Sequence, residues 1–353
     1  MKNFYLDADI DNILKNTRNS LDKISGKHIL ITGGNGFLGS YFVEIFRRYS
    51  LSIKNPIRLT VIDNLSIENS NNRKIPNSKN YNFKQLDASK PYKIQSKIDY
   101  IIHAAGIASP FYYRKKPLET LDIAINGTRH ALELAKSNSA KLLFFSSSEI
   151  YGDPDPSEVP INENYRGNVS TTGPRACYDE SKRLGETLCY IYNNYFKVNT
   201  KIIRPFNIYG PGMNQNDYRI LPNFASKLIN NEELNIYGTG KQTRTYCYIT
   251  DAMIGFIKTM INGFNGEVYN IGNPNQEVSV IDLYKIIKKL RKQKVKAKKV
   301  NYPSSYPTDE PQRRCPDISK AKKHFKYYPK VDLENGLNFF FEWAEKNYKK
   351  NKH

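Results

Sequence analysis

The sequence predicts an α/β protein with a Rossmann-type, doubly wound parallel sheet and a smaller C-terminal α/β lobe. Three observations support this fold class. Short apolar runs alternate with helical patterns from residue 27 to about residue 204, and such alternation is typical of a parallel sheet covered by helices on both faces. A glycine-rich loop joins the first apolar run to the first of these helices. The composition, with 39% hydrophobic and 12% aromatic residues, is that of a globular protein.

Six strands are expected in the larger part of the fold, because each is a short run rich in apolar residues. They are residues 27–32, 58–63, 82–87, 100–105, 141–146 and 198–204. The helical patterns between them are clearest at residues 40–49 and 118–137. Ahead of the first strand, the polar amphipathic stretch at residues 4–24 predicts one or two further helices.

The pattern is looser after residue 182. We expect helices at residues 220–229, 278–291, 318–324 and 333–346, with short strands at 234–238 and within 242–249. Several separate segments would therefore build a smaller lobe, rather than a tethered second domain.

The net charge of +20 raises the question of an anionic partner. The lysines are dispersed, although richest at residues 288–299 and 346–353, so we expect no nucleic-acid partner. We expect no membrane span, because no run of 18 apolar residues exists and the N-terminal segment is acidic and amphipathic. Four cysteines without paired spacing and five scattered histidines predict a reducing, cytoplasmic setting with no disulfide framework and no metal site.

The glycine-rich loop has the spacing of a dinucleotide cradle. Gly33 permits a tight turn, Gly36 lets the backbone approach a pyrophosphate, and Gly39 allows close packing of the helix. A structural turn would also explain three glycines, but Asp63 ends the second strand, where a carboxylate accepts from a ribose 2′-hydroxyl. This arrangement favours NAD over NADP. Further predicted cofactor contacts are Phe37, Leu38, Asn64, Asp87, Ala88, Ala104, Ala105, Asn126, Ser146, Tyr178, Lys182 and Pro205.

Two of these contacts have equally good alternatives. Asp87 ends the third strand, so it fits either a contact to the adenine or a strand-end cap. Asn126 interrupts a helix without a cap to explain it, which favours either a cofactor contact or a packing role.

Tyr178 and Lys182 carry most of the functional prediction. Four residues apart on a helix, they share one face, where the ammonium can lower the pKa of the phenol so that the tyrosine acts as a base. Behind a glycine cradle and a strand ending in serines 146–148, the pair resembles the triad of the short-chain dehydrogenase/reductase superfamily. The resemblance implies that Tyr178 takes a hydroxyl proton, that Lys182 holds the nicotinamide ribose, and that one serine binds the reacting oxygen.

From about residue 27 to residue 322 the chain resembles the extended branch of that superfamily, which contains nucleotide-sugar epimerases, dehydratases and decarboxylases. The supporting stretches are RPFNIYGP at 204–211, IYGTGKQTR at 236–244 and YNIG at 269–272. The resemblance implies a homodimer formed by a four-helix bundle from helices near 118–137 and 178–196. We predict an N-terminal helical extension at residues 1–26, an NAD-binding Rossmann domain at 27–204, and a mainly substrate-binding lobe at 205–353, with segments crossing between the lobes.

Within this branch the chain most resembles the UDP-glucuronate decarboxylase group. The resemblance rests on ASP at 108–110, SSEIYGDP at 147–154, YRGNV at 165–169 with GPRACYDESKR at 173–183, and DEPQRRCPDI at 309–318. It implies that Ser148, Glu149 and Arg314 are catalytic together with Tyr178 and Lys182. The predicted substrate-binding residues are Ser109, Asn207, Arg219, Tyr237, Arg244, Arg313 and Arg314.

The implied reaction oxidises carbon 4 of a UDP-glucuronate ring, so that the 4-keto acid loses carbon dioxide. The product is UDP-xylose or the 4-keto pentose. Arg166 replaces the usual tryptophan of the group, which leaves the sugar and the base open. A solvated loop residue at Glu149 and a surface basic patch at Arg313 and Arg314 are the alternatives to a catalytic role.

Three other functions compete with decarboxylation. A 4,6-dehydratase of this branch uses an Asp-Glu pair as its acid, and Ser148 stands at the aspartate position, which argues against dehydration. A 4-epimerase needs no glutamate at position 149. An inactive NAD-binding or scaffold protein is disfavoured by the intact Tyr178 and Lys182.

Overall fold

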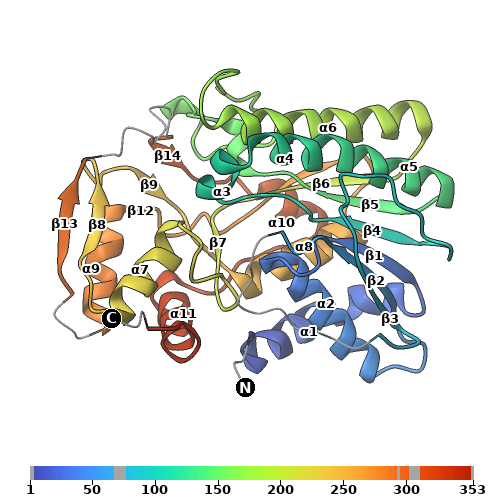
Figure 1. The fold of residues 1–353 in the computed structure, drawn as a ribbon, viewed down its shortest axis with the longest axis horizontal. Helices are drawn as coiled ribbons and strands as arrows, with labels where there is room; N and C mark the ends of the chain where they lie inside the picture. The colour runs from blue at the N-terminus through green and yellow to red at the C-terminus, as the bar shows by residue number, and fades with distance from the viewer. Residues whose placement is uncertain (1–3, 67–76, 292–294, 302–310, 351–353) are drawn as a thin grey trace.

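The computed structural model describes residues 4–66, 77–291, 295–301 and 311–350 (Figure 1). Its centre is a seven-stranded parallel sheet in the order β11-β6-β5-β4-β1-β2-β3. The strands are β1 (His28–Thr32), β2 (Arg58–Asp63), β3 (Tyr81–Gln85), β4 (Tyr100–His103), β5 (Lys141–Phe145), β6 (Thr200–Pro205) and β11 (Val268–Ile271). The predicted Rossmann-type fold class is confirmed.

Helices cover both faces of this sheet (Figure 1). On one face lie α1 (Asp7–Leu21) with the short 3-10 turn Asp22–Ile24, α2 (Phe37–Leu51) and α8 (Ile249–Asn262). On the other lie α4 (Pro117–Asp122), a π-helical turn (Ile123–Gly127), α5 (Thr128–Asn138) and α6 (Ala176–Phe196). Along β1, Ile29 and Ile31 pack toward the first set while Leu30 packs toward the second. The inner strands are mainly apolar because both of their faces are buried, whereas the edge strand β3 is polar and partly exposed.

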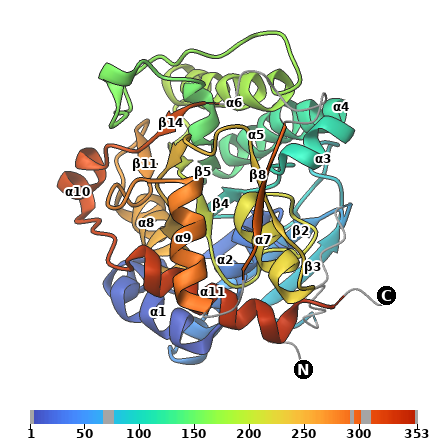
Figure 2. The same cartoon turned by 90° about the vertical axis from the view of Figure 1, so that its left-hand side faces the viewer.

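The second lobe is built around shorter elements, and Figure 2 shows it from its outer side. Its helices are α7 (Ile220–Ile229), α9 (Val280–Arg291) and α11 (Leu333–Asn347), whereas α10 (Ser319–Phe325) packs against α8 and β11 of the central layer. Its strand pairs are β8 (Leu234–Tyr237) with β13 (Ala297–Val300), and β7 (Ile208–Tyr209) with β10 (Cys247–Tyr248). A third small sheet has the order β12 (Val278–Ser279), β9 (Thr243–Arg244), β14 (Arg313–Arg314). Asp309 and Glu310 of the predicted 309–318 motif lie outside the described residues.

Two elements of the central layer went unpredicted. β11 completes one edge of the sheet and α8 packs under it, although both follow residue 204 in the sequence. The helix expected at 118–137 is also interrupted, because the π-helical turn Ile123–Gly127 separates α4 from α5. The chain thus returns to the first layer after entering the second lobe.

The N-terminal segment packs tightly against both lobes. Helix α1 lies against α8, where the buried Asp9 accepts a hydrogen bond of 2.8 Å from the Tyr248 hydroxyl. Tyr5 donates to the backbone carbonyl of Ser40 in α2 at 2.6 Å. The Phe4 ring lies against Gly212, in the loop after β7, so closely that a Cβ there would come within 2.5 Å of it. This segment therefore joins the helix after the glycine loop to the second lobe.

Candidate active site

The glycine loop is shaped by two close approaches that no larger residue allows. Gly33 has a φ of +72°, and a Cβ on it would lie 2.6 Å from the backbone of Ala105. A Cβ on Gly39 would lie 2.1 Å from the carbonyl oxygen of Gly33. The loop is thus pressed against the ends of β1 and β4, with the N-terminus of α2 behind it, as a pyrophosphate site requires.

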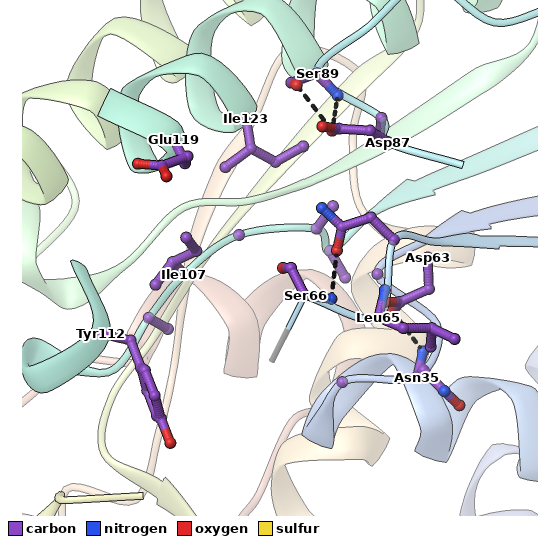
Figure 3. A pocket seen from close by; sticks show the side chains of 18 of the residues that line it. Asn35, Asp63, Leu65, Ser66, Asp87, Ser89, Ile107, Tyr112, Glu119 and Ile123 are labelled. Carbon is purple, nitrogen blue, oxygen red and sulfur yellow. Dashed lines mark hydrogen bonds between the residues drawn. The ribbon is translucent and has the colours of Figure 1, made fainter. Parts of the chain in front are cut away.

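Two aspartates lie in this region (Figure 3). Asp63 is the last residue of β2 and lies beside the glycine loop, and Asp87 follows the end of β3. The Asp63 carboxylate accepts backbone hydrogen bonds of 2.9 Å from both Asn35 and Leu65. Burial raises the pKa of Asp63, and these two hydrogen bonds oppose the shift. Asp87 accepts from the backbone and the hydroxyl of Ser89, at 2.9 and 2.8 Å. Asp87 therefore makes the local cap that the sequence left as an alternative, while still facing the cavity.

A cavity of about 330 Å³ opens beside both aspartates. Of the predicted residues, its lining includes Gly33, Gly36, Phe37, Asp63, Asn64, Asp87, Ala88, Ala104, Ala105, Ser109 and Arg219. Leu38, Gly39, Asn126, Ser146, Tyr178, Lys182 and Pro205 are outside this lining. Asn126 is exposed in the π-helical turn and donates to Asp122 at 3.3 Å. Ile107, Tyr112 and Glu119 line the cavity but were not predicted (Figure 3).

Helix α6 carries Tyr178 and Lys182, both buried; neither lines the cavity, but Lys182 lies next to Gly106, which does. Lys182 Nζ donates to the carbonyl of Phe145 at 2.7 Å and lies 5.7 Å from the centre of the Tyr178 ring. A Cβ on Gly106, which lines the cavity, would lie 3.5 Å from Nζ. Burial lowers the pKa of Lys182 to about 8, although the charge of Glu186 opposes this.

The acidity of Tyr178 differs from the sequence-based expectation. Burial raises the pKa of Tyr178 to about 12, and this effect exceeds that of its hydrogen bond with Ser147 and of the nearby Arg219 charge. The expected lowering of the phenol pKa by Lys182 is therefore not what this structure shows. Both members of the pair are instead shifted toward their neutral forms, as desolvation dictates.

The three serines after β5 have different surroundings. Ser147 is the one that bonds with Tyr178, and its oxygen also caps the short 3-10 turn Ser148–Tyr151 by accepting from the backbone of Glu149. Ser146 donates to Glu186 at 2.5 Å, and the predicted catalytic Ser148 is buried. Ser147 is thus a site residue that the sequence reasoning did not single out from its neighbours.

Glu149 lies in a buried ionic cluster rather than in solvent. One of its carboxylate oxygens pairs with Arg314 and the other with Arg175. Arg175 also donates to Asp179, one turn into α6, at 3.3 Å. Burial would raise the pKa of Glu149, but the charges of Arg314 and Arg175 outweigh it and lower that pKa.

The side chains of Arg313 and Arg314, which are neighbours on β14, lie in different surroundings. The Arg314 side chain is buried, and within the described part of the chain its Nε and Nη2 have no hydrogen-bond partner. Arg313 pairs instead with Glu277, at 2.8 and 2.9 Å, on the outside of the small sheet. The predicted catalytic arginine is therefore inside the cluster, and its predicted substrate-binding neighbour faces away from it.

The other predicted substrate residues lie around the second lobe. Arg219 lines the cavity in a paired contact with Asp217, and Asn207 donates to the carbonyl of Thr245 at 2.8 Å. Arg244 on β9 donates to the carbonyl of Thr243 at 2.8 Å. Tyr237 ends β8, outside the cavity lining.

Two buried hydroxyls within residues 109–113 are without a partner among the described residues. One belongs to the predicted Ser109 and the other to Tyr113, which was not predicted. The Tyr113 ring stacks on that of Tyr178, with the centroids 5.2 Å apart and the planes 11° apart. Arg175 and Asp179 were also missed, although an Arg and an Asp four residues apart at a helix start are a recognisable pair.

A glycine cradle with a carboxylate at the end of the second strand, and with a buried tyrosine and lysine on a neighbouring helix, is the arrangement of an NAD-dependent enzyme. The close approach of the glycine loop and the position of Asp63 suit the pyrophosphate and the ribose of NAD. The chain belongs to the NAD dependent epimerase/dehydratase family, whose model matches residues 29–272. NAD is the cofactor of this family.

Within this family, the chain is similar to proteins named UDP-glucuronic acid decarboxylase. The chain is 39% identical over 313 residues to UDP-glucuronic acid decarboxylase 1 of Xenopus tropicalis, covering 88% of this chain and 70% of the relative. It is 38% identical to UDP-glucuronic acid decarboxylase 6 of Arabidopsis thaliana, covering 91% and 89%. The solved UDP-glucuronic acid 4-epimerase of Bacillus cereus, in complex with UDP-glucuronic acid and NAD, shares the fold, with a TM-score of 0.74 and 24% identity over 91% of this chain and 100% of that one.

Proposed function

We propose that the protein decarboxylates UDP-glucuronate through a 4-keto intermediate, releasing UDP-xylose or the 4-keto pentose. The observation that carries the proposal is the buried cluster in which Arg314 and Arg175 hold Glu149 near Tyr178. Cationic donors at this place suit a sugar that carries a carboxylate. The two decarboxylases of more than a third identity support the same assignment.

The first step needs a base at carbon 4 of the sugar. When bound, NAD supplies the acceptor for the hydride of that carbon. Tyr178 takes the proton of the 4-hydroxyl, and the Ser147 hydroxyl, already bonded to Tyr178, holds the same oxygen. Lys182 places a positive charge next to the phenol and so favours the transfer.

The second step is the loss of carbon dioxide from the resulting 4-keto acid. The carbon–carbon bond breaks, and its electron pair passes into an enolate whose charge collects on the carbon-4 oxygen. Arg314 has two N–H groups within the cluster that no described residue uses, so it can stabilise that oxygen. Protonation at carbon 5 and return of the hydride removed in the first step reduce the ketone and give UDP-xylose. Release before that return gives the 4-keto pentose and leaves the hydride on the cofactor.

We also propose where the remaining parts of the enzyme act. Residues 205–353 would mainly bind the nucleotide sugar, through Arg219 and, once contacts rearrange, Asn207 and Arg244. The enzyme would be cytoplasmic, since all four cysteines are free and three of them are buried. Among the described helices, none is long and apolar enough to cross a membrane.

Decarboxylation is tested directly with purified protein, UDP-glucuronate and NAD, followed by mass spectrometry of the nucleotide sugars. A product lighter by carbon dioxide is expected, and its mass distinguishes UDP-xylose from the 4-keto pentose. Tyr178→Phe removes the base and should lower kcat by about 10²-fold or more. Unchanged UDP-glucuronate in the presence of bound NAD would refute the proposal, and loss of water from a UDP-hexose would replace it with dehydration.

A further inference from the structure

Four charged side chains form one chain of contacts from α6 to β14. Asp179 accepts from Arg175, Arg175 pairs with one oxygen of Glu149, and Arg314 pairs with the other oxygen. Asp179 and Arg314 are 4% and 2% exposed, and Arg175 is also buried. The helix that bears Tyr178 is thus joined to the strand that bears Arg314 through Glu149.

This geometry makes the direction of Arg314 depend on residues that are distant from it. Glu149 receives one arginine on each carboxylate oxygen, so it cannot rotate without breaking a contact. Arg175 is itself fixed by Asp179, through Nε at 3.3 Å. With Nη1 of Arg314 engaged by Glu149, the unused Nε and Nη2 are held in one orientation.

The two carboxyl groups of the cluster, Glu149 and Asp179, differ in how readily they ionise. Asp179 has one buried oxygen, Oδ1, without a hydrogen-bond partner among the described residues. Burial and the neighbouring Glu149 charge raise the pKa of Asp179, against the lowering effect of Arg175 and Arg314. With Glu149 ionised and Asp179 protonated, two arginines face one carboxylate, and the cluster has a net charge of about +1. The other ionisable groups of the described residues that face the cluster include Tyr113, Tyr178, Cys177 and Arg244.

We propose that Arg175 and Asp179 are positioning residues that select a carboxylate-bearing sugar, by fixing the Glu149–Arg314 pair and leaving one positive charge unbalanced. The inference rests on the proposed function, because it concerns the same sugar site. A sugar carboxylate would satisfy the charge and the unused Arg314 donors, whereas a neutral hexose would leave them buried and unpaired, which costs binding free energy.

The test compares the Kd of UDP-glucuronate with that of UDP-glucose by titration calorimetry on the NAD-loaded enzyme. In these titrations every protein also carries Tyr178→Phe, so that bound UDP-glucuronate is not converted. For the wild type we expect a preference for UDP-glucuronate of at least about tenfold, the low end for a charge-assisted buried contact. Arg175→Met and Asp179→Ala should reduce this preference to about threefold or less, while the Kd of UDP-glucose is unchanged. Asp179→Asn keeps an acceptor for Arg175, so it should retain the preference.

The pH dependence of the preference for UDP-glucuronate distinguishes the proposed positioning role from a purely structural role of Asp179. As the pH rises through the titration of Asp179, the net charge falls to zero and the wild-type preference should weaken. Asp179→Asn cannot ionise, so its preference should stay constant over the same range. Asp9→Ala is the matched control, because Asp9 is another buried aspartate but lies under the sheet against α8, away from this cluster. It should leave the preference unchanged.

The outcomes distinguish this inference from the proposed function. If the wild type decarboxylates UDP-glucuronate but Arg175→Met and Asp179→Ala keep the full preference, the positioning role is wrong and the function stands. If the preference behaves as expected but no carbon dioxide is lost, the function is wrong and the carboxylate selectivity stands. If Arg175→Met unfolds, the comparison of Asp179→Ala with Asp179→Asn decides, since they differ only in the acceptor for Arg175.

Discussion

Single residues in this site differ mainly in how burial changes their acidity. Tyr178 has a pKa raised to about 12, and Lys182 has a pKa lowered to about 8, because both are removed from water. A phenol is a useful base only when its charge is supported, so the ammonium of Lys182 must remain protonated. Glu186, one turn along α6, raises the Lys182 pKa and thereby helps to keep that charge.

This balance predicts the alkaline side of the pH profile. Lys182 is protonated below its pKa of about 8 and neutral above it, so kcat/KM should fall as the pH rises through about 8. Glu186→Gln removes the charge that raises this pKa, and the descending limb should move to lower pH. Steady-state assays of both enzymes from pH 6 to about 10 would check this. A limb that does not move, or that moves to higher pH, would refute the assignment.

Sequence patterns located the residues whose roles are local. Tyr178 and Lys182 lie on one helix face, and Asp63 ends a strand, so spacing alone was sufficient to place them. The ionic cluster was different, because Arg175 is 26 residues and Arg314 is 165 residues from Glu149. Only the folded chain shows which arginine reaches which oxygen. The run of three serines likewise gave no means of deciding that Ser147 faces Tyr178.

At the scale of elements, helix α8 was not predicted because its sequence lacks a distinctive local pattern. Ten of its 14 residues are buried, including Thr250, Asp251 and Thr259. Its residues are apolar on average, and a short apolar run cannot be distinguished from a buried strand by its periodicity alone. Helix α1, which covers it, is amphipathic and was predicted. Because α1 packs against α8, the N-terminal extension forms part of the helical layer that covers one face of the central sheet.

The contact between these two helices predicts a pH-dependent stability. Burial raises the pKa of Asp9 to about 7, against the lowering effect of its hydrogen bond from Tyr248. The folded state therefore keeps the proton more tightly than the unfolded state, whose pKa is near 3.8. This favours folding at low pH, and the advantage is lost as the pH rises from about 4 to about 7.

Asp9→Asn should remove that dependence, because an amide can accept from Tyr248 but cannot ionise. Relative to wild type, its free energy of unfolding should increase by about 2 kcal/mol between pH 5 and pH 7, at roughly 1.4 kcal/mol per unit. Urea unfolding of both proteins at these two pH values measures the difference. An equal difference at both pH values would contradict a buried, proton-binding Asp9.

At the scale of the whole molecule, the outer helical layer leaves large apolar side chains in water. On the outside of α4 and α6, Leu118 is 71% exposed and Leu184 is 42% exposed, and Tyr190 is exposed beside them. Figure 1 shows these helices side by side along one edge of the molecule. A helix of 21 residues is roughly 30 Å long, which is sufficient for an extended contact. We propose that this layer pairs with a second copy as a four-helix bundle.

The dimer is tested by light scattering on the wild type and on the double variant Leu118→Glu, Leu184→Glu. The wild type should have the mass of two chains at micromolar concentration. Because both copies of a two-fold dimer carry the substitutions, four apolar contacts of about 1.5 kcal/mol each are lost, which should raise the dimer Kd by about 10⁴-fold, and the added like charges should raise it further. Leu51→Glu is the matched control, because Leu51 is 78% exposed but ends α2 on the opposite face of the sheet.

Because the chain is strongly basic, the salt dependence of the dimer Kd provides a second test of the interface. Each copy has a net charge of +20, so two copies repel each other, and salt screens that repulsion within about 10 Å at 0.1 M. An apolar interface should therefore tighten as salt is added, whereas an interface held by ion pairs should loosen. A wild-type monomer at every salt concentration, or a double variant that remains dimeric, would exclude α4 and α6 as the pairing surface.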